Sequence, residues 1–159
     1  MHKGTNNFDY GSNHYPPKNH AQNQIIIKKD TSNVNNTAEY ELRTSNDQFT
    51  FAIGGSPSLS DSISASTVYT NKWYYVVGTY EGSTLKLYLN GTLINSKSTS
   101  FAIPLIANQL HIGDNYSSNF LNGRLGRIRV HYNALNDSQI YSTYLNEKPF
   151  YIAEPCIQP

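Results

Sequence analysis

The chain has 159 residues, a formal net charge of +1 at pH 7 and 38% hydrophobic residues, enough for one globular domain with a sizeable core. Only 14% of the residues are charged, so we expect no nucleic-acid partner, because that binding needs a basic surface. No apolar run approaches the ~20 residues that span a bilayer, and the polar opening shows no signal peptide. The single cysteine, Cys156, excludes an internal disulfide.

The first 23 residues are polar, rich in His and Asn, and interrupted by Pro16 and Pro17. They predict an irregular arm over residues 1–23. The domain itself is expected over residues 24–148. Its first strands are predicted near residues 25–28, 38–43, 49–53 and 63–69, where apolar residues cluster or alternate with polar ones.

Residues 73–97 carry the clearest pattern in the chain, WYYVVGTYEGSTLKLYLNGTLINSK. Apolar and polar residues alternate with the period of a strand, and Glu81-Gly82 supplies a turn. Asn90-Gly91 is a strong hairpin signal, because both residues tolerate positive φ. The pattern predicts three consecutive antiparallel strands. We expect four of its side chains to fill the core: Trp73, Leu85, Leu87 and Leu89.

Two further strands are predicted around Leu110 and Leu125, and a helix follows them. Asn136 has the position of an N-cap, with Gln139 three residues later in a capping-box arrangement. Because proline disrupts a helix interior, the helix is expected to end before Pro149 after two to three turns. Residues 149–159 are then predicted to be a tail.

The order of these motifs resembles the laminin G-like domains of the concanavalin A-like lectin/glucanase superfamily. The similarity begins in the Val-Val-Gly-Thr-Tyr and Leu-Lys-Leu-Tyr-Leu-Asn-Gly segments of residues 73–97. It continues through Leu-His-Ile-Gly at 110–113, Phe-Leu-Asn-Gly-Arg-Leu at 120–125 and residues 127–135, and covers roughly residues 25–145. The resemblance implies an all-β, two-sheet antiparallel jelly-roll sandwich with one short C-terminal helix.

Members of this family usually open with one or two strands that the sequence does not clearly contain. Only Phe8-Asp9-Tyr10-Gly11 is faintly similar to the first of them. An absent strand would leave an open edge, which invites a partner. We therefore hypothesise that a partner chain or a second copy completes the sandwich. The alternative is that residues 5–24 supply a divergent strand.

Glucanases of the superfamily carry several carboxylates on one strand face, and this chain lacks such a run. The nearest candidate is Glu39 with Glu41, which share a strand face with Arg43 and have no third acid. We expect these three side chains to form a solvated charged face, and we predict that the chain is not an enzyme.

Resemblance to the family also suggests a calcium site at the rim of the sandwich. Ca²⁺ takes six to eight oxygen ligands, so loops rich in Asp and Asn are the places to look. The candidates are Asp114 and Asn119 in the loop of residues 113–119, with Asp61 as a further ligand. The alternative is that these residues only cap local turns.

A sugar site needs a flat aromatic ring beside hydrogen-bonding side chains. The sequence offers this chemistry near the same loop, at Asp114, Asn115, Tyr116, Asn119 and Arg124. Tyrosines predicted to point outward, Tyr74, Tyr88 and Tyr132, offer it as well, although tyrosines on a sheet often only pair across strands.

These features together predict a non-catalytic recognition or adhesion module, with a glycan or glycoprotein surface as its partner. An extracellular, cell-surface or virion-surface location is favoured. The alternative is a structural or assembly protein, such as a virion or surface-fibre component, that uses the sandwich as a building block.

Overall fold

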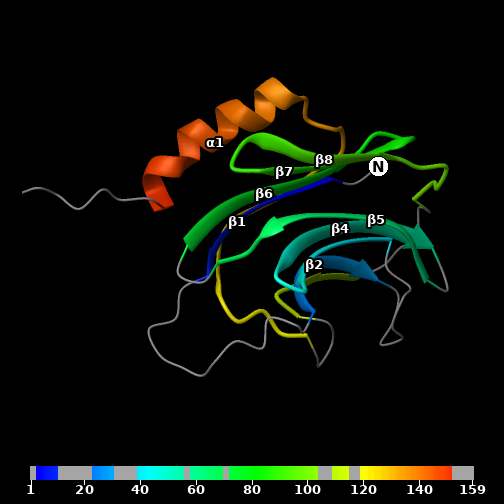
Figure 1. Cartoon of the computed structure of the whole chain (residues 1–159), viewed down its shortest axis with the longest axis horizontal. Helices are drawn as coiled ribbons and strands as arrows, with labels where there is room; N and C mark the ends of the chain where they lie inside the picture. Colours follow the sequence, from blue (N-terminus) through cyan, green and yellow to red (C-terminus); the bar gives the residue numbers. More distant parts are fainter. Residues whose placement is uncertain are drawn as a thin grey trace, which may run out of the picture.

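The computed structural model describes residues 3–10, 23–30, 39–55, 58–69, 72–103, 109–114 and 119–151. These ranges form two five-stranded antiparallel sheets and one helix (Figure 1). The first sheet has the order β10 (Arg124–His131), β1 (Lys3–Tyr10), β6 (Lys72–Tyr80), β7 (Thr84–Leu89) and β8 (Thr92–Ser98). The second has the order β5 (Ser58–Thr67), β4 (Gln48–Gly55), β3 (Tyr40–Ser45), β2 (Gln24–Asp30) and β9 (Gln109–Ile112). The predicted two-sheet sandwich is confirmed.

Strand β1 corrects part of the predicted irregular arm of residues 1–23, because residues 3–10 form a regular strand. It lies in the middle of the first sheet, antiparallel to both β10 and β6, with Thr5 opposite Arg129 on one side and Val77 on the other. The chain therefore supplies its own opening strand, and no partner is needed at that place. The sequence of β1, KGTNNFDY, is mostly polar and has no clear apolar alternation, so its pairing with distant strands was not visible locally. Residues 11–22 lie outside the described part of the chain.

The main core lies between the two sheets. Tyr74, Val76 and Tyr80 of β6 and Leu85 and Leu87 of β7 pack against residues of the second sheet, including Phe49, Phe51 and Ile53. The sheets approach closely at Gly78. A Cβ placed there would lie 2.5 Å from Cγ of Phe51, so the Phe51 ring occupies the space that any other residue would need.

The β7–β8 turn forms as the Asn-Gly pair predicts. Asn90 and Gly91 have φ values of 51° and 80°, the positive values that a tight hairpin turn requires. The Asn90 side chain also accepts a hydrogen bond from the Tyr75 amide at 3.0 Å, which ties the turn to β6.

Helix α1 (Asp137–Tyr151) covers the outer face of the first sheet (Figure 1). Its capping box is confirmed, because the Gln139 amide donates to the Asn136 side chain and the Asn136 amide to the Gln139 side chain, both at 2.9 Å. Ile140 is fully buried against Tyr75, Val77 and Tyr88 and forms a second, smaller core.

The predicted end of the helix before Pro149 is wrong, because Pro149 lies inside α1. Near a helix end, a proline removes only one backbone hydrogen bond, and contacts with the sheet hold the last turn. The Tyr151 ring packs on Trp73 with ring centroids 4.6 Å apart, and its hydroxyl accepts from the Arg127 amide at 3.2 Å. The helix therefore continues to Tyr151.

The same contact corrects the placement of Trp73. Trp73 is half-buried beneath the end of α1 on the outer face, and it is not part of the core between the sheets. Leu85 and Leu87 are in the core as expected, and Leu89 packs at its margin.

Candidate functional site

The rim loop predicted to bind a ligand begins after β9. Asp114 lies beside His111, with 3.4 Å between a carboxylate oxygen and Nδ1. Asn119 has a φ of 54°, and its carbonyl accepts from the Ile25 amide at 2.9 Å. The Leu121 amide donates to the Gly113 carbonyl, so both ends of the loop lie beside the start of β2. Asn115 and Tyr116 lie outside the described residues.

The other two predicted site residues lie on different elements. Arg124 is exposed at the start of β10 in the first sheet. Asp61 belongs to β5 and forms an ion pair with Lys97 of β8, which lowers the pKa of its carboxyl through a direct hydrogen bond. Among the described residues, no three His, Cys, Asp or Glu side chains gather closely enough to hold a metal ion. The calcium site therefore stays a prediction.

The carboxylates of Glu39, just before β3, and of Glu41, within β3, are buried, whereas the sequence predicted a solvated charged face. Glu39 is 1% exposed and pairs with Lys29 at 3.0 Å, and Glu41 is similarly buried and pairs with Arg43. Burial lowers the pKa of Arg43. Two buried carboxylates, each held by a cation, are poorly placed to meet a sugar substrate or a hydrolytic water.

Two of the three tyrosines predicted to point outward do not. Tyr74 faces the main core, and its hydroxyl accepts from the Tyr69 amide at 2.9 Å. Tyr88 lies beneath α1 and donates to Asp137 at 2.7 Å, and burial raises the pKa of its hydroxyl. Tyr132 alone of these is strongly exposed, at 76%. Helix α1 covers the outer sheet face at Tyr88, so this tyrosine is not available to a ligand.

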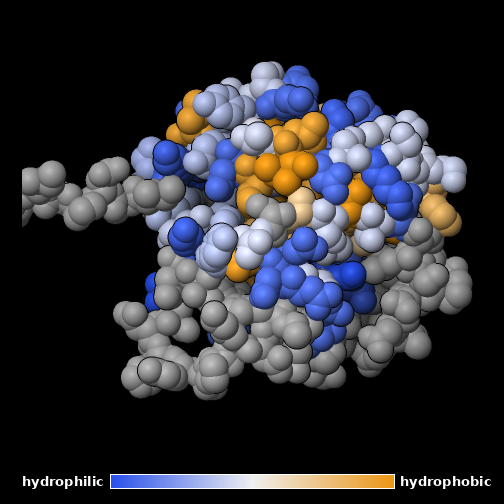
Figure 2. Space-filling model, viewed as in Figure 1, coloured by the Kyte–Doolittle hydropathy of each residue, from blue (hydrophilic) through white to orange (hydrophobic). Residues whose placement is uncertain are grey.

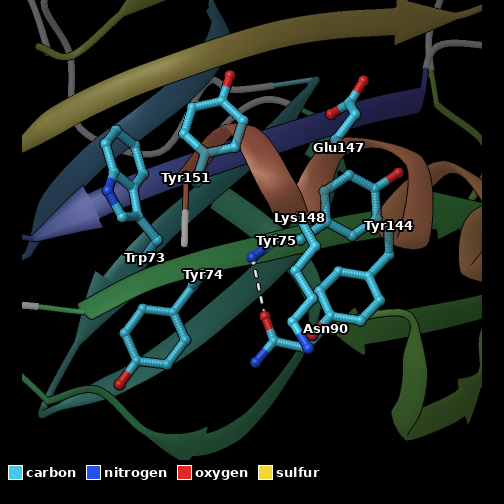
Figure 3. Close-up of a pocket in the computed structure, with 8 residues that line it drawn as sticks. All are labelled: Trp73, Tyr74, Tyr75, Asn90, Tyr144, Glu147, Lys148 and Tyr151. Atoms are coloured by element: carbon cyan, nitrogen blue, oxygen red, sulfur yellow. Dashed lines mark hydrogen bonds between the residues drawn. The ribbon is translucent and has the colours of Figure 1, made fainter. Parts of the chain in front are cut away.

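An aromatic cavity lies between β6 and the second half of α1. Figure 3 shows Trp73 and Tyr151 side by side at one end, and Tyr75 and Tyr144 pack at 6.0 Å at the other. Its volume is about 20 Å³, close to what one water molecule needs. The residues resemble a sugar platform in type, but the space is too small for a sugar ring.

A larger groove runs between β10 and the first half of α1, with a volume of about 490 Å³. Its polar walls come from Arg129 and His131 on the strand and from Ser138, Gln139, Ser142 and Thr143 on the helix. This groove was not predicted. The only sequence feature that could have indicated the groove is the row of polar residues on the helix. An ordinary solvated helix face has the same pattern, so this feature does not distinguish the two.

The face in Figure 2 is mostly hydrophilic, with an apolar area near its centre, where Figure 1 draws β7 and β8. Exposed apolar side chains on the edge strand β8 include Leu93 and Ile94, at 39% and 42% exposure. A second exposed pair, Leu110 and Ile112, lies on the edge strand β9 of the other sheet.

Residues 12–141 match a laminin G family described as the concanavalin A-like lectin/glucanases superfamily. The chain belongs to this superfamily. Among curated proteins, no sequence matches the chain. The family assignment agrees with the two-sheet fold and with the order of the motifs along the chain.

Solved structures share the fold at low identity. The receptor-binding domain of botulinum neurotoxin mosaic serotype C/D is 18% identical with a TM-score of 0.66, over 92% of this chain and 36% of that one. Trypanosoma rangeli sialidase is 14% identical with a TM-score of 0.66, over 92% and 23%. A Bacteroides ovatus protein inferred to bind carbohydrate is 17% identical with a TM-score of 0.61, over 88% and 39%. The chain thus spans well under half the length of each.

Proposed function

We propose that this chain is a non-catalytic recognition module that binds carbohydrate. The observation that carries the proposal is the open polar groove between β10 and α1. The buried carboxylates of the described residues are all ion-paired, which supports the non-catalytic part of the proposal. A groove of this size falls within the roughly 300–1,000 Å³ of ordinary ligand pockets.

The similar structures support a binding role. One is the receptor-binding domain of a botulinum neurotoxin, and another is a protein inferred to bind carbohydrate. The sialidase is an enzyme, but this chain matches only 23% of it. In this chain, Glu39 and Glu41 are the nearest approach to a glycosidase pair, and both are buried against cations.

A glycan array combined with sizing of the native protein tests the proposal. Specific array signals that free sugar competes away, with no release of reducing ends from a β-glucan, are the expected result. Cleavage of the glucan by the wild type that disappears in a Glu41→Gln variant would overturn the proposal that the chain is non-catalytic.

A structural or assembly role is the second candidate. It is favoured by exposed apolar residues on one edge strand of each sheet, Leu93 and Ile94 on β8 and Leu110 and Ile112 on β9, because exposed edges of this kind promote association. A large, stable particle on sizing, together with a blank array, would favour this role over carbohydrate binding.

The predicted rim site is a separate proposal within the same function. Asp114 and Asn119 would hold calcium or contact the sugar there, with Asn115 and Tyr116 contributing. Calorimetry with calcium tests it directly. No heat of binding, and no change in melting temperature on adding a chelator, would remove the metal.

A further inference from the structure

The two sheets of the described residues end in the edge strands β10, β8, β5 and β9, and three of these carry features that hinder pairing with a further strand. Strand β5 has two register shifts against β4, and its Ser62 amide donates to the Asp61 side chain. Strand β8 has a register shift against β7, its Ser96 amide donates to the Asn95 side chain, and Lys97 adds a charge. Bulges, edge charges and occupied amides are the ordinary protection of a sheet edge.

Strand β10 is protected in a similar way, and β9 is not. Strand β10 has a register shift against β1, and its Arg127 amide donates to the Tyr151 hydroxyl of α1 at 3.2 Å. Strand β9 keeps a regular register with β2 along its whole length, and its sequence, QLHI, contains no Asp, Glu, Lys or Arg. Among the described edge strands, β9 is therefore the one suited to accept another strand.

The backbone of β9 turns two residues toward its open edge. The Gly113 amide, just after the strand, donates to the Ile26 carbonyl of β2 at 3.1 Å. Hydrogen bonds in an antiparallel pair alternate, so every second residue faces the neighbouring strand. His111 therefore faces β2 as Gly113 does, while Leu110 and Ile112 direct their amides and carbonyls away from it.

The side chains of the same two residues are apolar and exposed. Leu110 is 45% exposed and Ile112 is 48% exposed. Ile112 lies opposite Ile27 of β2, which is buried in the main core, so both side chains lie on the inner side of the sheet. Because Leu110 is two residues from Ile112, it lies on that side as well. The main core thus reaches an apolar margin at this edge.

These positions make β9 complementary to a second copy of itself. If two β9 strands run antiparallel about a two-fold axis at His111, Leu110 of each copy lies opposite Ile112 of the other. Both residues direct their backbone groups toward the edge, so each pair exchanges two hydrogen bonds. The same register places aliphatic side chains beside aliphatic side chains on the inner side.

The charges near the axis are compatible with this pairing. The two copies of His111 would lie directly opposite each other, and like charges in such a position destabilise a sheet. An Asp114 carboxylate oxygen lies 3.4 Å from Nδ1 of His111, so each copy brings an acid beside its imidazole. The strand itself adds no Asp, Glu, Lys or Arg that would meet its equivalent across the axis.

We infer that two copies of this chain associate through β9, antiparallel about a two-fold axis at His111, and so join two five-stranded sheets into one continuous sheet. The strand has four residues, so the contact is small. Interfaces below about 1,200 Å² belong to weak complexes, and we expect a Kd between about 10 μM and 1 mM. The inference is independent of carbohydrate binding, because the groove between β10 and α1 involves the other sheet.

Sedimentation velocity of the full chain tests the association. The wild type is expected to change from monomer to dimer as its concentration rises from about 10 μM to about 1 mM. Leu110→Lys places a charge at the edge, as Lys97 does on β8, and should weaken the dimer at least about tenfold. Leu93→Lys is the matched control, since Leu93 is an apolar residue of β8 with 39% exposure, and it should leave the dimer unchanged.

Three results would overturn the inference. The first is a wild type that stays monomeric at the highest concentration. The second is a Leu110→Lys dimer as strong as that of the wild type. The third is loss of the dimer in Leu93→Lys with its retention in Leu110→Lys, which would place the contact at β8. Circular dichroism melts check that both lysine variants fold.

Cysteine cross-linking tests the register without the lysine variants. Each cysteine is introduced alone into a Cys156→Ser background, which removes the natural thiol. Opposed residues of a non-hydrogen-bonded pair have Cα atoms about 4.5 Å apart, within the range of a disulfide. His111→Cys should therefore give a covalent dimer on mild oxidation, and Leu110→Cys, which lies opposite Ile112 of the other copy, should give far less. Equal yields from the two variants, or no dimer from His111→Cys, would refute the two-fold pairing at His111.

Discussion

Replacing Gly78 by alanine tests how closely the two sheets are packed. The new Cβ would lie 2.5 Å from Cγ and 2.9 Å from Cδ1 of Phe51, closer than real side-chain carbons approach. Phe51 is 2% exposed and surrounded by core residues, so its ring has little room to move. Overpacking of a dense core costs about 1–3 kcal/mol; at about 2 kcal/mol, Tm falls by about 4–8 °C for a domain of this size.

The double variant Gly78→Ala with Phe51→Leu separates the clash from other effects of alanine. Leucine is smaller than the ring, so the pair should be less destabilised than the sum of the single variants, by at least about 0.5 kcal/mol in urea unfolding. Gly113→Ala is the contrast, because a Cβ there meets nothing within 4 Å but φ is +81°. Its cost should be unaffected by Phe51→Leu. A loss below about 0.5 kcal/mol for Gly78→Ala, or strict additivity, would refute the packing argument.

Ile140→Ala is expected to lower the free energy of unfolding by about 2–4 kcal/mol, because Ile140 is fully buried beneath α1; Leu145→Ala, half exposed on the same helix, should cost under about 1 kcal/mol in the same urea titration. Asn136→Ala removes the cap of α1 and should cost about 1 kcal/mol, measured likewise; an unchanged midpoint would contradict the capping role. Burial and the Glu147 charge raise the pKa of Tyr75 from 10.0 to about 12, so the unfolded chain ionises first. The stability that the Tyr75 hydroxyl contributes is present below pH 10 and is lost as pH rises towards 12. The free energy of unfolding of Tyr75→Phe should therefore fall less than that of the wild type between these pH values. Identical pH profiles for the two proteins would contradict the raised pKa.

Local patterns in the sequence predicted local structure well. The Asn90-Gly91 turn and the capping box at Asn136 formed as expected, because each depends on residues that are neighbours in the chain. Strand β1 was missed because its pairing with β6 and β10 joins segments far apart in the sequence. The helix end was misplaced because Tyr151 is held by Trp73, again a distant residue.

Strand β6 explains why alternation alone could not predict which tyrosines are exposed to a ligand. Tyr74 and Val76 face the main core, while Tyr75 and Val77 face α1, so both sides of the strand are buried. Alternation identifies a strand but does not say which of its faces is covered. Because α1 covers the second face of β6, the tyrosines on that face cannot contact a ligand.

The same helix creates a surface that the sequence does not display. Burial of Ile140 sets the helix on the sheet, and the Glu147–Arg129 ion pair holds it against β10. The polar residues Ser138 and Ser142 are thereby brought beside His131. The groove is thus a product of helix docking, so a variant that loosens the helix should lose the groove and the second core together. Ser142→Trp, which leaves the docking contacts in place, should lose only the groove.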